Sequence, residues 1–161
     1  MEAVSAHKSG RIDAAQKSYL SLRSLYPQNF DVVHLLGLTY FQVKNYSRSL
    51  AVIKEAIELN PSSAMAHSNL GNVYKSLGDF QSALASYDRA LSLNREFIDA
   101  RYNRGNAQYA LNNPDGALKD YEHVLRQQPG HYMAMIAMSN VLRERGEMEQ
   151  ALQVVDRALS V

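Results

Sequence analysis

A spacing of 34 residues recurs along this chain of 161 residues and constrains its fold more than any other feature. The segments "SNLGNVYKSLGDF" at 68–80 and "YNRGNAQYALNNP" at 102–114 both contain Asn-x-Gly-Asn. Residues at the same position in successive periods are said to share a phase. Four small residues share one phase: Gly37, Gly71, Gly105 and Ser139. A fixed period of 20–50 residues is typical of proteins built from stacked repeats. We therefore expect each period to form one structural unit that buries its apolar face only against its neighbours.

Each period contains two helical patterns. In 64–77 and again in 80–93, apolar residues recur at every third or fourth position, which is the spacing of one helix face. Gly78 separates the two stretches and is typical of a helix C-terminus. No segment alternates between apolar and polar residues over a useful length, so we predict an all-α fold without strands.

Small residues and proline also recur at fixed positions of the 34-residue period. Glycine inside a helix costs roughly 1 kcal/mol relative to alanine, so its return at one phase indicates that a neighbouring backbone approaches closely there. The second helix carries a matching alanine series: Ala83, Ala117 and Ala151. Proline occupies one further phase at Pro27, Pro61 and Pro129. Arg95 stands at that phase in the remaining period, so we expect the helix before it to continue further than the others.

The sequence Leu70-Gly71-x-x-Tyr74, followed by Ala83-x-x-x-Tyr87 and a closing proline phase, resembles the tetratricopeptide repeat (TPR). The resemblance extends over the whole chain. It implies a right-handed solenoid of antiparallel helix pairs, whose first helices line a groove that binds peptides or partner proteins. It also divides residues 1–161 into a single array of a partial repeat (1–29), full repeats (30–63, 64–97 and 98–131) and a truncated final repeat (132–161).

Asparagine recurs at two phases of the first helix, three residues apart, and therefore on one helix face. A side-chain amide offers both donors and an acceptor, so a row of amides could hold the backbone of an extended peptide. The same amides could instead bond to neighbouring helices or to water, and both interpretations stay open. The predicted peptide- or partner-binding residues are Asn69, Asn72, Asn103, Asn106 and Asn140, flanked by Tyr102, Lys75, Tyr109 and Arg143.

Arg104 and Asp120 are charged, whereas the residues at the same positions of the other repeats are uncharged. The residues in phase with Arg104 are apolar: Leu36, Leu70 and Met138. The residues in phase with Asp120 carry no charge: Ser18, Val52, Ser86 and Val154. A partly buried guanidinium needs a partner, and both exceptions fall in one repeat. We therefore predict a structural ion pair between Arg104 and Asp120.

Composition and motifs exclude several classes of function. The net charge of +1 argues against nucleic acid and anionic membranes as partners. The chain has no cysteine, no signal peptide pattern and no apolar run long enough for a membrane span, which favours a cytoplasmic protein. Its five histidines have no metal-binding spacing, and no phosphate-binding loop or nucleophile motif occurs. We expect no enzymatic activity, no cofactor and no metal site.

A protein-interaction module that binds a peptide or a partner protein is the expected function, and two alternatives stay open. Residues 7–38, "HKSGRIDAAQKSYLSLRSLYPQNFDVVHLLGL", resemble the opening of bacterial SPINDLY and O-linked N-acetylglucosamine transferase-like proteins. That resemblance implies the substrate-recruiting arm of a larger glycosyltransferase. The phases that carry the lysines of carboxylate-binding TPR domains hold no lysine or arginine here, so we expect no capture of a terminal carboxylate.

The second alternative is a self-assembling scaffold. Leu152, Val155 and Leu159 share the phases that earlier second helices bury, but no further first helix follows them in this sequence. An uncovered apolar face of this kind is unusual for a monomer. It predicts either homo-oligomers that form through the terminal helices or a piece of a longer array. Four methionines in the final unit (Met133, Met135, Met138 and Met148) favour core packing over an adaptable binding surface.

Overall fold

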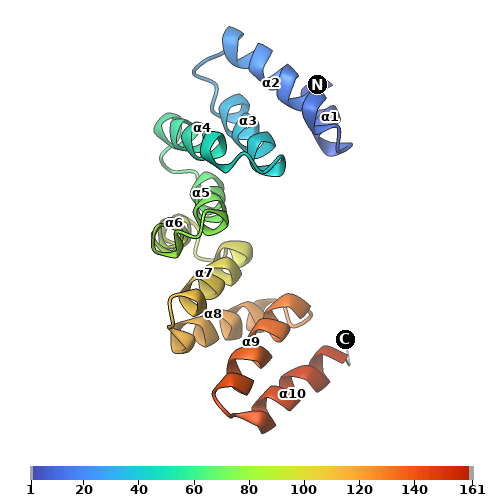
Figure 1. Cartoon of the computed structure of the whole chain (residues 1–161), viewed down its shortest axis with the longest axis vertical. Helices are drawn as coiled ribbons and strands as arrows, with labels where there is room; N and C mark the ends of the chain where they lie inside the picture. Colours follow the sequence, from blue (N-terminus) through green and yellow to red (C-terminus); the bar gives the residue numbers. More distant parts are fainter. Residues whose placement is uncertain (1, 160–161) are drawn as a thin grey trace. The chain divides into compact units, whose positions relative to one another are not determined.

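The structure of the chain is a computed structural model that describes residues 2–159 and, among these, the side chains of 3–156. All regular secondary structure within this range is α-helical, as the sequence predicts (Figure 1). The helices are α1 (Glu2–Lys8), α2 (Ile12–Leu25), α3 (Phe30–Gln42), α4 (Tyr46–Leu59), α5 (Ala64–Ser76), α6 (Phe80–Leu93), α7 (Ile98–Ala110), α8 (Pro114–Gln127), α9 (Tyr132–Glu144) and α10 (Met148–Leu159).

Polar side chains begin several of these helices. The side chain of Asn29, for example, accepts a hydrogen bond of 3.1 Å from the backbone N–H of Val32. Such a bond satisfies one of the N–H groups that a helix start leaves without a partner. Five residues with positive φ follow the odd-numbered helices at intervals of 34: Gly10, Lys44, Gly78, Asn112 and Gly146. The period of 34 residues is therefore present in the backbone conformation as well as in the side chains. The chain turns at the same position in each repeat, directly after the first helix.

The expectation that the helix before Arg95 continues further is wrong. Helix α6 ends at Leu93 and has 14 residues, the same length as α4. The carboxamide oxygen of Asn94 accepts a hydrogen bond of 3.1 Å from the backbone N–H of Glu96. Asn60, which follows α4, makes the equivalent bond to Ser62. A local side-chain bond therefore ends both helices, and proline at the later position is not required.

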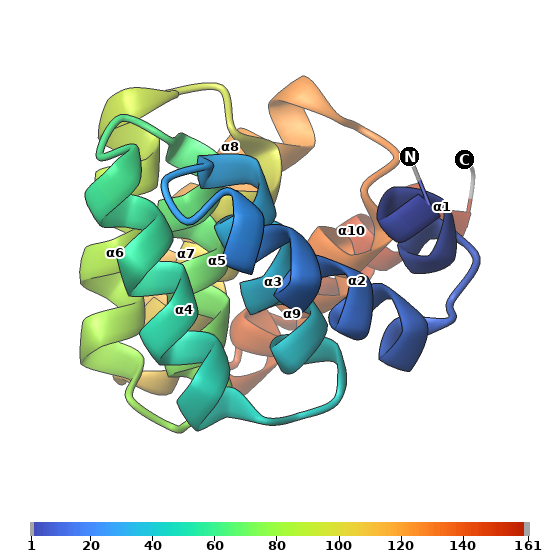
Figure 2. The same cartoon turned by 90° about the horizontal axis from the view of Figure 1, so that it is seen from above.

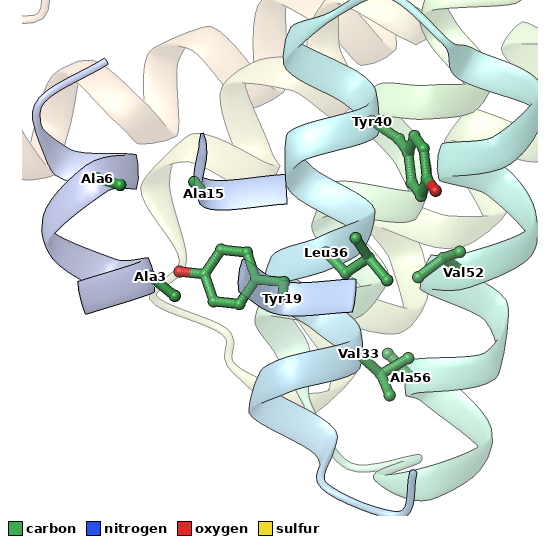
Figure 3. Packing of buried hydrophobic residues seen from close by; sticks show 9 residues of the cluster. All are labelled: Ala3, Ala6, Ala15, Tyr19, Val33, Leu36, Tyr40, Val52 and Ala56. Carbon is green, nitrogen blue, oxygen red and sulfur yellow. The ribbon is translucent and has the colours of Figure 1, made fainter. Parts of the chain in front are cut away.

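The chain forms two compact units, Met1–Asp79 and Phe80–Val161, which are described separately. In the first unit, α3 lies beside α4 in both views (Figure 1, Figure 2). Figure 3 shows its core, where the ring of Tyr19 is directed at Ala3 and Val33 faces Ala56. In the second unit, α8 packs against α7 and α9, and α9 packs against α10. Successive helices in each unit thus bury one another's apolar faces.

The missing side chains of Gly37 and Gly105 leave room for large side chains of the second helix in the same repeat. A methyl group added to Gly105 would lie 2.7 Å from Cε1 of Tyr121, and one added to Gly37 would lie 2.6 Å from Cγ1 of Ile53. The nearest neighbour is therefore a side chain and not the backbone that the glycine pattern suggested. In the last repeat, where the smaller Val155 is in phase with Tyr121, serine is present at position 139.

The last described helix leaves part of its apolar face uncovered. Leu152 is 61% exposed, whereas Leu118, one period earlier, is 9% exposed because it packs in the core formed with α9. Val155 is also exposed, and the side chain of Leu159 lies outside the described residues. Association through the terminal helices stays a prediction.

We predict that Gly105→Ala destabilises the second unit although alanine is the better helix former. Overpacking typically costs about 1–3 kcal/mol, which exceeds the roughly 1 kcal/mol gained in helix propensity. Ser139→Ala is the matched control at the same phase; it removes a hydrogen bond of 3.4 Å from Ser139 Oγ to the carbonyl oxygen of Ala151 but adds no atom, so we expect its free energy of unfolding to change by less than about 1 kcal/mol. Urea denaturation measures both values. A variant Gly105→Ala more stable than the parent would contradict the close contact with Tyr121.

Candidate functional site

Asn69 connects α5 to α3, which are the first helices of two successive repeats. Its Nδ2 atom, on α5, lies 3.0 Å from Nε2 of His34 on α3. Because the amide nitrogen donates, Nε2 accepts and the imidazole is neutral. His34 is buried and stacks on the ring of Phe30 with 5.2 Å between the ring centroids. Burial lowers the pKa of His34, and the charge of Asp31 opposes this shift in part.

Asn106 has a defined orientation in the second unit. Its Oδ1 atom accepts a hydrogen bond of 2.8 Å from the hydroxyl group of Tyr121. Tyr121 is buried, and burial is the main reason that its pKa is raised above the ordinary value. Since the amide oxygen is engaged by this hydroxyl, the NH2 group of Asn106 is directed elsewhere and is available as a donor.

Helix α9 presents an exposed amide and an exposed cation one turn apart. Asn140 and Arg143 are both exposed, and a separation of three residues places them on one helix face. Neither makes a hydrogen bond or an ion pair with another side chain among residues 3–156. Tyr109 of α7 donates a hydrogen bond to the carboxylate of Glu144, which raises the pKa of the phenol.

The remaining predicted residues are less accessible. Asn72 and Lys75 of α5 are half-buried and make interactions within the chain, and burial lowers the pKa of Lys75. Asn103 is half-buried on α7 and is also engaged within the chain. The ring of Tyr102 lies 5.1 Å from that of His131 and 6.1 Å from that of Tyr121, measured between centroids.

Within each unit, the predicted residues lie on one helix or on helices that contact each other. Helix α7 also contacts α9, and these two helices carry Tyr102, Asn103, Asn106, Tyr109, Asn140 and Arg143. Helix α5 of the first unit carries Asn69, Asn72 and Lys75. Whether these residues bind a peptide stays a prediction.

Two apolar residues extend the α9 face. Met133 is 43% exposed and Ile136 is 52% exposed. Together with Asn140 and Arg143 they recur at steps of three, four and three residues, which keeps them on one face. We call these four residues the α9 face. Of the methionines that the sequence predicts to pack in the core, Met135 is buried, whereas Met133 and Met148 are exposed.

Arg104 and Asp120 are joined by two hydrogen bonds. Nε and Nη2 of Arg104 lie 2.7 and 2.6 Å from the two carboxylate oxygens of Asp120. The exposed fraction of the side chain is 21% for Arg104 and 4% for Asp120. This pairing raises the pKa of Arg104. The sequence pattern missed two further members of the cluster, Asp88, which lies 2.8 Å from Nη1 of Arg104, and Arg101, which lies 3.6 Å from Asp120.

No side-chain group within the described part of the chain has the composition of a metal site. Each helix in residues 2–159 is too short or too polar to cross a bilayer.

Known proteins share both the repeat pattern and the fold. A family model described as "TPR repeat" matches residues 37–78 and 71–112, and one described as "Tetratricopeptide repeat" matches residues 102–160. A crystal structure of MamA is 24% identical with a TM-score of 0.90, and the match covers 98% of this chain and 92% of that chain.

Two further solved structures concern peptide binding. The first TPR of Spaghetti (RPAP3), bound to the HSP90 peptide SRMEEVD, is 26% identical with a TM-score of 0.72, and the match covers 74% of this chain and 94% of that chain. YrrB, described as a TPR protein with an unusual peptide-binding site, is 22% identical with a TM-score of 0.81, and the match covers 98% of this chain and 81% of that chain.

We predict that the Arg104–Asp120 pair can be replaced as a unit but not broken. Asp120→Val alone leaves the guanidinium with Asp88 but removes two charge-assisted hydrogen bonds from a partly buried group, which should cost roughly 2 kcal/mol. The double variant Arg104→Met/Asp120→Val copies Met138 and Val154 of the next repeat, and we expect it to be more stable than Asp120→Val by about 1 kcal/mol, although Arg101 also loses its contact with Asp120. Asp88→Asn at the exposed edge should cost less than about 1 kcal/mol. Urea denaturation of the four proteins measures the coupling, and equal effects of the single and double variants would argue against a structural role of the pair.

We also predict that the first unit loses stability on acidification through His34. The folded state has the lower pKa, so the unfolded state binds more protons once the pH falls below about 6.5, the ordinary value for histidine. The free energy of unfolding should therefore decrease from pH 7.5 to pH 5. In His34→Gln, whose amide oxygen can still accept a bond from Asn69, this decrease should be smaller. The same pH dependence in both proteins would show that His34 does not contribute.

Proposed function

Because the chain belongs to the tetratricopeptide repeat family, we propose that it is a protein-interaction module that binds an extended peptide segment of a partner protein. The proposed contact residues in the second unit are the α9 face together with Asn106 and Tyr109 of α7. The observation that carries the proposal is the α9 face itself, where apolar, amide and cationic side chains are exposed in line on one helix.

Each part of this surface suits a different part of a peptide. Met133 and Ile136 can bury an apolar side chain, and methionine adapts to its shape. The NH2 group of Asn106 and the amide of Asn140 can bond to peptide carbonyl and N–H groups. Arg143 can pair with a carboxylate. The ligand class that matches is an extended segment with an apolar residue near an acidic one.

The known structures support the same function. One neighbour is bound to a peptide, and another is described by its peptide-binding site. The phases that hold lysine in carboxylate-binding TPR domains hold Tyr102 and Ile136 here. We therefore propose an internal peptide segment and not a chain terminus as the ligand. A purely binding role requires no catalytic group, cofactor or nucleic acid.

Self-association is a second candidate, favoured by the exposed Leu152 and Val155. The role of a glycosyltransferase arm and the cytoplasmic location stay predictions.

We predict that Asn140→Ala/Arg143→Ala weakens binding of peptides selected from a random library against the parent protein. Each lost hydrogen bond contributes about 0.5–1.5 kcal/mol, so two losses should raise the Kd roughly tenfold. The matched control is Lys119→Ala/Gln127→Ala, which removes exposed side chains of α8. Isothermal titration measures the Kd.

Asn106 needs its own control because Asn106→Ala also removes the bond from Tyr121. Tyr121→Phe removes that bond but keeps the amide, so a larger loss of affinity in Asn106→Ala would indicate contact with the ligand. Peptides that bind the α9 variant and the parent equally well would place the binding site elsewhere.

A further inference from the structure

A cavity that no predicted site includes lies between the last two repeats. Its volume is ≈ 410 Å³, within the range of about 300–1,000 Å³ that is typical of ligand pockets. Residues of helices α8, α9 and α10 border it, and it is open to solvent on one side. Among the residues whose side chains the structure describes, those that line it are Glu122, Leu125, Arg126, Met135, Met138 and Val154.

The equivalent place one repeat earlier is filled by an arginine. Glu122, Met138 and Val154 lie 34 residues after Asp88, Arg104 and Asp120 respectively. In that earlier repeat, the guanidinium of Arg104 lies between α6, α7 and α8 and bonds to both aspartates. Met138 and Val154 are uncharged, and Met138 carries no group that reaches an acid at Glu122. The cavity is therefore lined by the residues in phase with the Arg104 site, where the uncharged Met138 stands in place of the arginine.

The cavity retains one of the two acids of that arginine site, with Glu122 in phase with Asp88. Leu125 and Met135 are buried and give it an apolar floor. Glu122 lies at its edge, is exposed, and makes no ion pair with any side chain in 3–156. Arg126 also lies at the edge, and no hydrogen bond or ion pair joins it to Glu122. The result is an apolar floor with one carboxylate and one guanidinium at its edge, and no ion pair joins either of them to another side chain in 3–156.

We propose that this cavity binds an arginine side chain of a partner protein. The methylene groups of the arginine lie against Leu125, Met138 and Val154, as long cationic side chains commonly pack along apolar surface. The guanidinium pairs with the carboxylate of Glu122, whose two oxygens match its planar fork. Lysine fits less well because its point charge cannot form the bidentate pair. This site lies on other residues than the α9 face, so either proposal can fail alone.

The test is a titration of the full chain, labelled with ¹³C at the methionine methyl groups, with N-acetyl-arginine N-methylamide. We expect saturable NMR shifts of Met135 and Met138, and none of the exposed Met133 and Met148, which lie outside the cavity. The citrulline analogue has the same shape without the charge and should bind about threefold to fivefold more weakly, the value of one exposed ion pair. Agmatine lacks the peptide groups, and tighter binding of agmatine would overturn the assignment to a protein side chain.

Two variants complete the test. Glu122→Gln should reduce the affinity for the arginine probe to that for the citrulline probe, whereas Glu149→Gln, an exposed acid of α10 outside the cavity, should not change it. Met138→Arg/Val154→Asp rebuilds the earlier arginine site within the chain and should abolish probe binding. Absence of saturable shifts, or equal affinity for the two probes, overturns the proposal. If the double variant does not fold, the comparison of Glu122→Gln with Glu149→Gln decides alone.

Discussion

The close contact between a small residue of one helix and a large side chain of the next is the interaction on which the described structure depends. The ring of Tyr121 occupies the space that a side chain at Gly105 would need, and Ile53 does the same at Gly37. This contact sets the distance between the paired helices. It also orients a site residue, because the hydroxyl group of the same Tyr121 bonds to Asn106, the residue that follows Gly105.

The period predicts most of the fold because helix faces and small-residue contacts depend on residues close in sequence. The unusual charges of Arg104 and Asp120 predict a pair for the same reason, since each breaks a pattern visible within one phase. Other interactions could be found only from the structure, because comparison of equivalent positions in the repeats does not indicate them. Asn94 ends its helix through a side-chain bond, and Asp88 joins the cluster from a phase where charged residues are ordinary. The bond from Asn69 to His34 joins two repeats and has no counterpart in the pattern of either one.

One place in the repeat is filled in different ways along the chain. Leu36 and Val52 are buried in the first unit, Arg104 and Asp120 form an ion pair, and Met138 and Val154 line a cavity. A repeat array tolerates such differences because each repeat contacts only its neighbours, so a change in one repeat leaves distant packing intact. The shared backbone therefore allows each repeat to acquire its own surface chemistry.

The two kinds of asparagine on these helices should contribute differently to binding. The amide of Asn106 is already held by Tyr121, so a ligand that bonds to its NH2 group loses little side-chain freedom. Asn140 is exposed and without a bond to another side chain in 3–156, so a ligand must order it on binding. Ordering a short side chain such as that of asparagine costs about 0.5 kcal/mol, which offsets part of what the hydrogen bond contributes. The contribution of an amide to ligand affinity therefore depends on the bond it already makes within the fold.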